Sequence, residues 1–301
     1  MITRLQFLTR AAGLVFGTGA LTGLYAWRVE PHWLEIVRRP LGIPNLPDAL
    51  VGRTLAQVSD IHVGRVDEDY LVTTLDRVAA LSPDIIMLTG DYVTWNSARQ
   101  YDLLSRVVAH LKPAPIATLG ILGNHDYGPN WEHLDIAAAV TGRMEAAGVR
   151  MLRNEAADIA GLRVIGLEDF WGPRFGPSGL FAAHQPGSPS IALCHNPDAC
   201  DARVWGGYDG WILSGHTHGG QVKPPFLPPP VLPVQNKRYT AGEFALSGGR
   251  RLYINRGVGH LLRVRFNVRP EVTLFTLEKD GKTEGRKDGK TEGRKDGSGS
   301  L

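Results

Sequence analysis

Cysteine is scarce in this sequence, and its scarcity excludes one way of holding a fold together. Only Cys194 and Cys200 occur among the 301 residues, so the chain is not built on a framework of disulfides. We expect both residues to be free thiols, with Cys194 buried in a strand, and a single bridge between them in an exported protein is the alternative.

A block of basic residues is also missing. The chain has 33 Lys and Arg against 30 Asp and Glu, and the positive residues are neither clustered nor interleaved with exposed aromatic residues. Nucleic acid is therefore not an expected partner, and no obligate protein partner is evident. The hydrophobic content of 43% and the charged content of 21% are ordinary for a globular protein that buries a sizeable core.

Charge is absent from one stretch near the N-terminus. Residues 11–27 carry no charged side chain, and Arg10 and Arg28 flank them. This length lies between the core of a signal peptide and a membrane-spanning helix of about 20 residues. Because no small-x-small cleavage site stands out near Ala26, we expect residues 1–28 to be an uncleaved membrane anchor, with a removed signal as the alternative. We expect the following domain on the exported side of the membrane, with the cytoplasmic face as the alternative.

Large apolar residues are missing from the other end of the chain. From Glu278 onward the sequence has seven basic and six acidic residues and repeats GKTEGRKD twice. Such a segment cannot bury a core. We therefore predict a folded domain over residues 29–277 and a disordered, low-complexity tail over residues 278–301.

Five short apolar runs in the middle of the chain end in the same way. Each run has the length of a strand and is followed by residues drawn from Asp, His and Asn. The runs end at Val58, Leu88, Leu122, Cys194 and Leu213. Between them, residues 67–81, 98–111 and 131–147 have helix-like patterns. This alternation predicts an α/β domain whose sheets are covered by helices.

The polar residues after these runs form a coherent set of metal ligands. Ligands bind beyond the carboxyl ends of strands in α/β sheets, so we expect seven side chains to meet: Asp60, His62, Asp91, Asn124, His195, His216 and His218. Carboxylate, imidazole and amide oxygen together suit ions such as Mn, Fe, Zn or Co. Two ions that share a bridging carboxylate would use all seven residues, and such a pair clamps both oxygens of a displacement at phosphorus. The pattern therefore indicates phosphoester hydrolysis.

The ordered motifs D-x-H, GD, GNHD, H and GHTH resemble those of the calcineurin-like metallophosphoesterases. The resemblance covers about residues 52–277, and GNHD and GHTHGGQ are its most specific blocks. Residues 30–64, GLEDFWG and residues 253–277 further resemble the membrane-associated bacterial phosphodiesterases of this superfamily. The resemblance implies a four-layer α-β-β-α sandwich with two mixed sheets and a dinuclear metal site at the strand ends.

The same resemblance implies a role for each ligand. It implies that one ion is held by Asp60, His62 and His218, that the other is held by Asn124, His195 and His216, and that Asp91 bridges them. The implied cofactors are two divalent ions, Mn, Fe or Zn, with Mn favoured, and a hydroxide that they share attacks phosphorus.

Two further residues have catalytic roles by resemblance. His125 is similar to the family's catalytic histidine, which stabilises the transition state or protonates the leaving oxygen. Asp126 is then expected to orient the His125 ring. A plain turn or helix-start residue is the alternative for Asp126.

Substrate recognition has no motif of its own. Candidates for binding a second phosphate are Lys237, Arg238, Arg256, Arg263 and Arg265, with ordinary surface charge as the alternative. The proline-rich residues 223–239 are either an apolar wall over the metals or a rigid connector. Since DYVTWN after Gly90 lacks the arginine of the protein Ser/Thr phosphatases, phosphoprotein is not an expected substrate.

These observations predict a metal-dependent phosphodiesterase or pyrophosphatase that acts at the membrane. The expected partner is a phosphorylated small molecule or lipid, and the enzyme is expected to act on a lipid-linked or nucleotide-type phosphate. The resembled family includes UDP-diacylglucosamine pyrophosphatases of lipid A synthesis, which are the specific alternative. A non-catalytic metal-binding scaffold is an alternative of another class, and the presence of every ligand and of His125 argues against it.

Overall fold

The computed structural model describes residues 3–94, 97–177, 179–182 and 184–280. The disordered tail expected over residues 278–301 lies, from residue 281 onward, outside the described residues. The last strand, β12 (Glu271–Lys279), runs two residues past the expected domain end at residue 277. It does so because Glu278 and Lys279 still pair with Gly42 and Ile43.

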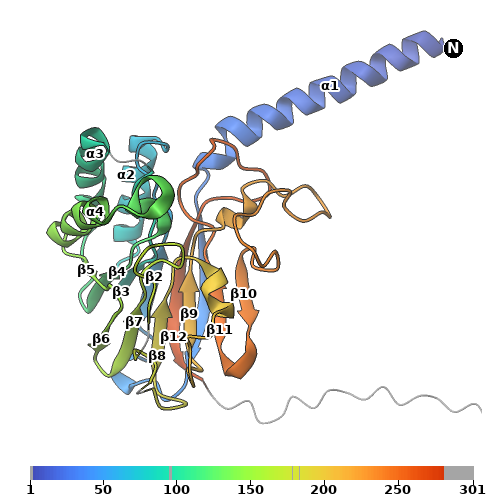
Figure 1. Ribbon diagram of the computed structural model, residues 1–301. Helices are drawn as coiled ribbons and strands as arrows, with labels where there is room; N and C mark the ends of the chain where they lie inside the picture. The colour runs from blue at the N-terminus through green and yellow to red at the C-terminus, as the bar shows by residue number, and fades with distance from the viewer. Residues whose placement is uncertain (1–2, 95–96, 178, 183, 281–301) are drawn as a thin grey trace, which may run out of the picture.

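The first of two mixed sheets has six strands in the order β1-β12-β2-β3-β4-β5 (Figure 1). Four of them, β2 (Thr54–Val58), β3 (Ile85–Leu88), β4 (Ala117–Gly120) and β5 (Arg150–Met151), are parallel. β1 (Glu35–Ile43) is parallel to β12, and β12 is antiparallel to β2. All four residues of β3 are buried, as expected of a parallel strand that is covered on both faces.

The second sheet also has six strands, in the order β10-β11-β9-β8-β7-β6. Its centre is parallel and consists of β11 (Arg251–Ile254), β9 (Trp211–Ser214), β8 (Ser190–Leu193) and β7 (Leu162–Gly166). The edge strands β10 (Gly242–Ala245) and β6 (Glu155–Ile159) are antiparallel to their neighbours. The expected pair of mixed sheets is confirmed.

Three apolar clusters separate the layers of the sandwich. One lies between the two sheets and includes Leu55, Met87, Leu193 and Leu213. Another packs the helices α2 (Glu68–Ala80), α3 (Ala98–Val108) and α4 (Leu134–Ala146) on the first sheet (Figure 1). The third covers the outer face of the second sheet with loops and the short 3-10 helix η5 (Pro197–Asp201). The fourth layer is therefore made mainly of loops.

The three helices begin where their capping residues place them. The side chains of Asp67 and Ser97 accept hydrogen bonds from backbone N–H groups of the first turns of α2 and α3. α4 begins at Leu134 rather than at residue 131, because Asn130 and Trp131 have φ of 57° and 62°, outside the helical region.

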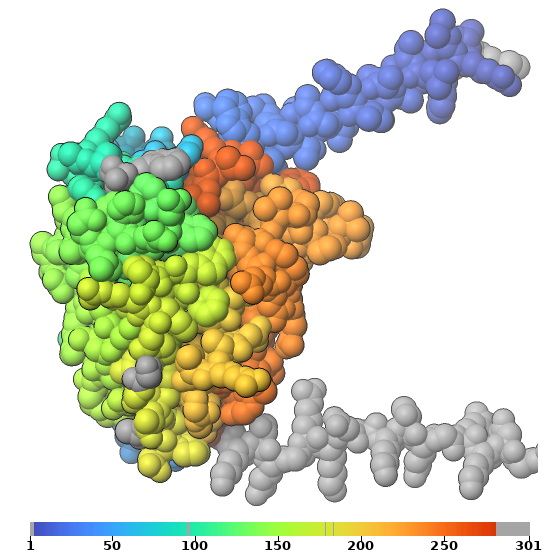
Figure 2. Space-filling view, viewed as in Figure 1, coloured from blue at the N-terminus to red at the C-terminus, as the bar shows by residue number. Residues whose placement is uncertain are grey.

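The N-terminal helix α1 (Arg4–Arg28) leaves the domain and makes few contacts with it (Figures 1 and 2). A capping box of Thr3 and Gln6 starts the helix, and Arg265 N donates to Ala26 O near its end, at 2.9 Å. Its length and composition suffice to cross a membrane, although an N-terminal signal sequence passes the same test. The helix is therefore weak evidence for an anchor.

Candidate metal centre

The seven candidate ligands follow the carboxyl ends of parallel strands from both sheets. Asp60 and His62 follow β2, Asp91 follows β3, and Asn124 opens the 3-10 helix η3 (Asn124–Tyr127) after β4. His195 follows β8, and His216 and His218 follow β9. The polar atoms of six of them form two buried groups that could each hold a metal ion, one of Asp60, His62 and His218 and one of Asp91, His195 and His216. The structure therefore brings together the side chains that follow β2, β3, β8 and β9.

The backbone turns sharply at most of these residues. φ is positive at Asp60, His62, Asp91, His216 and His218, with values from 48° to 70°. A left-handed conformation in a residue other than glycine costs on the order of 1–3 kcal/mol, and such residues cluster at functional sites. These left-handed residues turn the chain after β2, β3 and β9 so that their side chains face one another.

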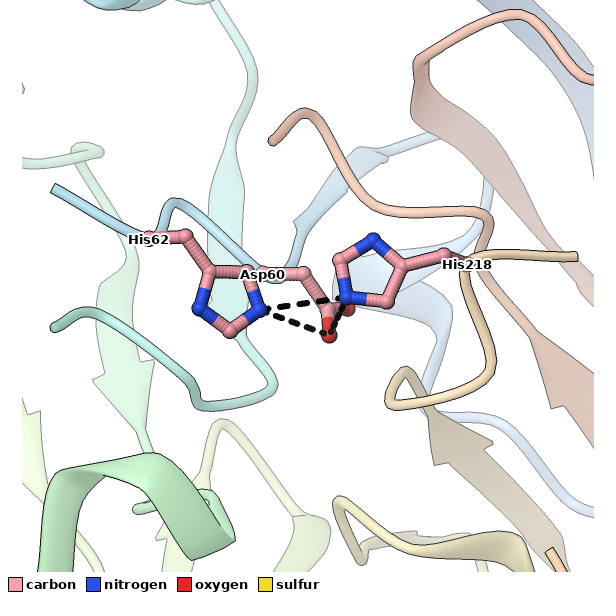
Figure 3. A group of neighbouring side chains, drawn as sticks. All are labelled: Asp60, His62 and His218. Atoms are coloured by element: carbon pink, nitrogen blue, oxygen red, sulfur yellow. Dashed lines mark hydrogen bonds and ion pairs between the residues drawn. The ribbon is translucent and has the colours of Figure 1, made fainter. Parts of the chain in front are cut away.

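Asp60, His62 and His218 point toward one another in the first group (Figure 3). His62 Nε2 lies 3.1 Å from His218 Nε2, and Asp60 Oδ1 lies 3.3 Å from His218 Nε2 and 3.9 Å from His62 Nε2. Asp60 also accepts the backbone N–H of His216 at 3.1 Å. This contact ties the end of β2 to the end of β9, so the group spans both sheets.

Backbone carbonyls orient the two histidines of the second group. His195 Nδ1 lies 2.6 Å from Thr89 O, and His216 Nε2 lies 2.7 Å from Pro233 O. An N–H that donates to a carbonyl leaves the opposite ring nitrogen free for a metal ion. His195 therefore offers Nε2 to an ion, and His216 offers Nδ1.

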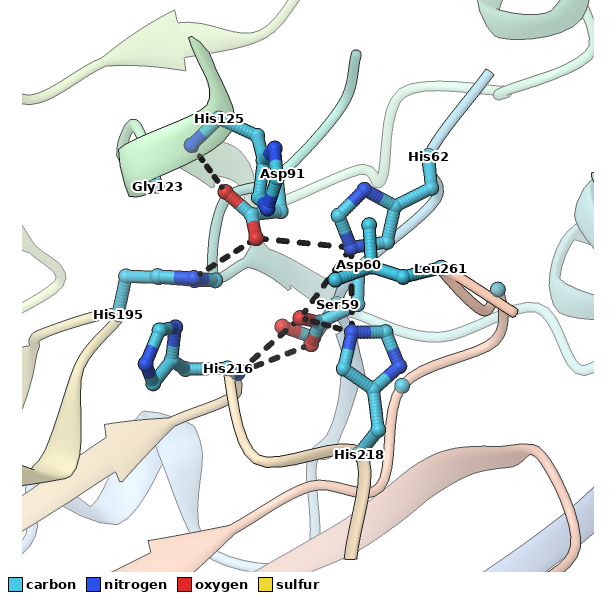
Figure 4. A network of polar contacts seen from close by, with 12 residues as sticks. Ser59, Asp60, His62, Asp91, Gly123, His125, His195, His216, His218 and Leu261 are labelled. Carbon is cyan, nitrogen blue, oxygen red and sulfur yellow. Dashed lines mark hydrogen bonds and ion pairs between the residues drawn. The ribbon is translucent and has the colours of Figure 1, made fainter. Parts of the chain in front are cut away.

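Asp91 lies between the two groups (Figure 4). Its Oδ2 is 3.1 Å from His195 Nε2 and 3.5 Å from His62 Nε2, while its Oδ1 accepts the backbone N–H of His125 at 2.9 Å. The buried atom Asn124 Oδ1 has no hydrogen-bond partner among the described residues. Since buried polar atoms are normally satisfied, this atom fits a centre that receives ions.

Burial keeps three of the imidazoles in the form that binds metals. It lowers the pKa of His62 and of His216 to about 3 each, and that of His218 well below its usual value. Burial raises the pKa of Asp60 to about 7. At these four side chains the loss of solvation outweighs the charges nearby, and a divalent cation would favour the unprotonated form of each.

Asp91 and His195 behave as an ion pair. Burial opposes the charged form of each, yet the carboxylate of Asp91 and the acids around it raise the pKa of His195 to about 10. The charges of His195 and His125 likewise hold the pKa of Asp91 well below its usual value, against the effect of burial. Without metal, His195 therefore carries a proton that an ion has to displace.

Two motif glycines, Gly123 and Gly215, allow the ligand-bearing loops to approach one another closely. A Cβ on Gly123 would lie 2.6 Å from Asp91 N and closer still to Asp91 Oδ1. A Cβ on Gly215 would collide with Ser59 Oγ and Asp60 Oδ2. The glycines of GNHD and GHTH are thus required by the space at the site.

Asp126 does not orient the ring of His125 as the sequence predicted. Its Oδ2 accepts the N–H groups of Asp91 and Gly123, each at 2.9 Å, and its Oδ1 accepts those of Tyr92 and Val93 at 2.8 and 3.1 Å. These four donors occupy the carboxylate, so Asp126 fastens the GNHD loop to the GD loop. The half-buried His125 ring instead lies edge-on to the His62 ring, with centroids 5.1 Å apart.

The cations proposed to bind a second phosphate have structural partners. Lys237 Nζ donates to Leu232 O and Val234 O at 2.7 and 2.5 Å, and Arg238 donates to Ala245 O at 3.1 Å. Arg256 pairs with Glu271 and Glu35 at 2.5 and 3.0 Å. These contacts favour the alternative reading, in which the three side chains do not bind substrate.

The remaining two candidates also face the protein. Arg265 is buried and donates to the backbone carbonyls of Arg256, Gly257, Gly259 and Val268. Arg263 Nη2 lies 3.5 Å from His32 Nε2. Arg263 therefore points away from the metal centre, whereas Arg265 Nη2 also lies 3.5 Å from His218 Nδ1 and so borders one of the ligands.

Two tryptophans that the sequence pattern did not single out extend the site. Trp171 lies edge-on to the His216 ring, with centroids 4.6 Å apart, and Trp131 stacks on Trp171 at 4.7 Å. Both indoles are half-buried. Trp171 belongs to GLEDFWG, but its distance in sequence from His216 gave no signal of this contact.

Known proteins that are similar in sequence to this chain carry the names of phosphoesterases. The family model described as calcineurin-like phosphoesterase matches residues 53–220. Phosphodiesterase YaeI of Escherichia coli (strain K12) is 33% identical over 92% of this chain and 100% of its own length. Metallophosphoesterase YkuE of Bacillus subtilis (strain 168) is 31% identical over 92% of this chain and 98% of its own. UDP-2,3-diacylglucosamine pyrophosphatase LpxG of Chlamydia trachomatis is 26% identical, over 89% and 96%.

Proposed function

Because the chain belongs to the calcineurin-like phosphoesterase family, and is therefore a phosphoester hydrolase, we propose that it cleaves phosphodiester or pyrophosphate bonds at a membrane surface with two divalent ions. One observation carries the proposal. Asp91 Oδ2 lies 3.1 Å from a histidine of one ligand group and 3.5 Å from a histidine of the other. These two distances support Asp91 as the single carboxylate that bridges two ions and offsets their mutual repulsion.

In this proposal each group of ligands holds one ion. Asp60, His62 and His218 hold the first, and Asn124, His195 and His216 hold the second. Asn124 adds a neutral oxygen, which limits the negative charge at the centre. We favour Mn, since carboxylate, imidazole and amide oxygen together form a set of intermediate hardness.

Two bound ions would lower the pKa of a water molecule and neutralise charge on the phosphoryl oxygens. The residues around them supply position and protons. His125 is held by its backbone N–H on Asp91 Oδ1, so its half-buried ring stands beside the ligand groups without being one of the ligands. From there it donates a hydrogen bond or a proton to the phosphoryl or leaving oxygen, which contributes on the order of 10²–10⁴ in rate.

The relatives and α1 support a proposal for the substrate class. Relatives named as a phosphodiesterase and as a UDP-2,3-diacylglucosamine pyrophosphatase both match about nine-tenths of the chain, at 92% and 89%. We propose a lipid-linked or nucleotide-type phosphate as substrate, with α1 as the anchor and the domain on the exported side. Protease accessibility of the domain in spheroplasts tests the side of the membrane.

A second candidate function is the cleavage of UDP-2,3-diacylglucosamine itself. It is favoured by the similarity to LpxG, which extends over 96% of that protein. The two candidates share the metal centre and differ only in what the surrounding surface binds.

Hydrolysis by the metal-stripped protein, with Mn added back, tests both candidates. Bis-p-nitrophenyl phosphate and UDP-2,3-diacylglucosamine are assayed side by side, with His125→Ala as the impaired variant and Asp102→Asn, an exposed change on α3, as the matched control. Preference for the lipid nucleotide supports the second candidate, and activity on the small diester alone supports a general phosphodiesterase. Metal-dependent activity on neither substrate would contradict the proposal and favour a scaffold.

A further inference from the structure

Exposed apolar side chains outside α1 gather in two loops. Beyond residue 29, eight large hydrophobic residues are exposed among the described ones: Trp33, Val51, Leu134, Phe226, Leu227, Val231, Leu262 and Val264. The last five lie in residues 223–234, which we call the proline loop, and residues 259–269, which we call the arginine loop. Isolated exposed apolar residues need no explanation, but a group of them marks an interaction surface.

The proline loop is built to present its apolar side chains outward. Leu232 and Val234 are buried and anchor it, while Phe226 is fully exposed at 105% of its reference area. Phe226 has a φ of 64°, a conformation that costs energy in a residue with a side chain. Lys237 Nζ fastens the anchored half through Leu232 O and Val234 O. The tip therefore projects from a firmly held base.

The two loops and the end of α1 form one continuous surface. Gln221 Nε2 donates to Leu262 O and Val264 O at 2.7 and 2.8 Å, and Lys223 N donates to Phe266 O at 2.8 Å. Arg265 N in turn donates to Ala26 O in α1. Figures 1 and 2 show the tip of the proline loop projecting on the side of the domain toward which α1 extends.

The chemistry of this surface matches a lipid interface. Residues 221–242 and 256–270 contain no Asp or Glu, and Lys223, Arg263 and Arg269 add positive charge. Arg269 lies over the ring of the exposed Trp33, 4.3 Å from its centroid. Tryptophan is enriched at membrane interfaces, and basic residues attract anionic headgroups.

Proline has a specific advantage in such a loop. Six of the twelve residues at 223–234 are proline, so half of the loop has no backbone N–H. A backbone N–H that enters lipid without a partner costs several kcal/mol, and a proline avoids that cost. A protein partner would instead offer carbonyls to such donors, so the composition favours lipid as the occupant.

We propose that the proline loop and the arginine loop dock into the interfacial layer of a lipid bilayer beside α1, with anionic headgroups at the basic residues. Both loops border the metal centre: Pro233 O contacts His216 Nε2 at 2.7 Å, and Gly259 N donates to Asp60 O at 2.7 Å. Docking brings the centre to the headgroup layer, where a lipid-borne phosphate reaches it. The inference rests on the membrane anchorage in the proposed function but not on the assignment of the ions.

Site-directed fluorescence of the full chain tests this docking. Leu227→Cys carries a nitrobenzoxadiazole label at the tip of the proline loop. Ala160→Cys carries the same label at the exposed turn between β6 and β7. This turn lies at the amino end of β7, whereas the metal centre lies beyond the carboxyl ends of the parallel strands. Cys194 and Cys200 are buried, and the wild-type chain measures any background labelling.

Each labelled protein is reconstituted into vesicles of phosphatidylethanolamine and phosphatidylglycerol, and flotation measures its association with lipid. The proposal predicts a shift of the emission at position 227 to shorter wavelength and quenching by doxyl-labelled lipid, with neither effect at position 160. If the protein floats with the vesicles but the label at position 227 shows no more emission shift or quenching than the label at position 160, the docking proposal is wrong. Protein that fails to float would overturn both docking and anchorage, while hydrolysis of a soluble diester would show that the enzymatic proposal still holds.

Discussion

Asp126→Asn is the change that best separates a structural role from a catalytic one. The carboxylate accepts four backbone N–H groups, two on each oxygen, whereas an asparagine accepts on one side only. Its amide nitrogen would face two of the donors and leave them buried and unpaired, at about 1–3 kcal/mol each. The loss of folding free energy is therefore about 2–6 kcal/mol. At roughly 2–4 °C per kcal/mol for a domain of this size, Tm falls by about 4–24 °C.

Thermal unfolding with and without Mn measures this effect, beside the rate of diester hydrolysis. Asp102→Asn is the matched control, because an exposed change of this kind usually alters stability by less than about 0.5 kcal/mol. We expect Asp126→Asn to lower Tm and Mn affinity together, since the Asp91 and Gly123 backbones shift. An unchanged Tm with a lower kcat would refute the structural role of Asp126 and would favour the alternative, in which Asp126 orients the His125 ring.

Three further predictions concern the same centre. Gly123→Ala places a Cβ 2.6 Å from Asp91 N, so the variant should bind Mn more weakly than the wild type in calorimetry. Wild-type affinity for Mn would contradict the close approach of Gly123 to Asp91. Mn at 100 times its Kd should stabilise the fold by about 2.7 kcal/mol per site, and a Tm that a chelator leaves unchanged would contradict a site formed only in the folded chain. The pKa is about 10 for His195 and about 7 for Asp60. Binding of the ions therefore displaces about one proton at pH 8, from His195, and about two below pH 6, from His195 and Asp60. Metal affinity should rise with pH for this reason. Calorimetry in buffers of different ionisation enthalpy measures that release, and its absence at both pH values would contradict the assignment.

The ligand set could be predicted because it depends on local sequence. Each apolar run identifies a strand, and parallel strands end at one edge of a sheet, so residues that follow them meet wherever the sheets pack. Asp91 and His195 are far apart in sequence, yet both follow buried parallel strands. The alternation of strands and helices likewise predicted an α/β domain, whereas the two mixed sheets were implied by the family resemblance.

Roles that depend on distant partners could not be predicted in this way. Arg256 looked available for phosphate until Glu35, at the other end of the chain, was found to pair with it. Asp126 follows His125 directly, but its partners at residues 91–93 belong to another strand end. The carbonyl of Pro233 that orients His216 has no side-chain signature at all.

Electron paramagnetic resonance of the Mn-loaded protein tests the central claim most directly, together with its metal content. Two ions bridged by Asp91 predict two Mn per chain and the signal of an exchange-coupled pair. In Asp91→Ala that coupled signal should be lost. One Mn per chain with an uncoupled signal in the wild-type protein would contradict the dinuclear centre.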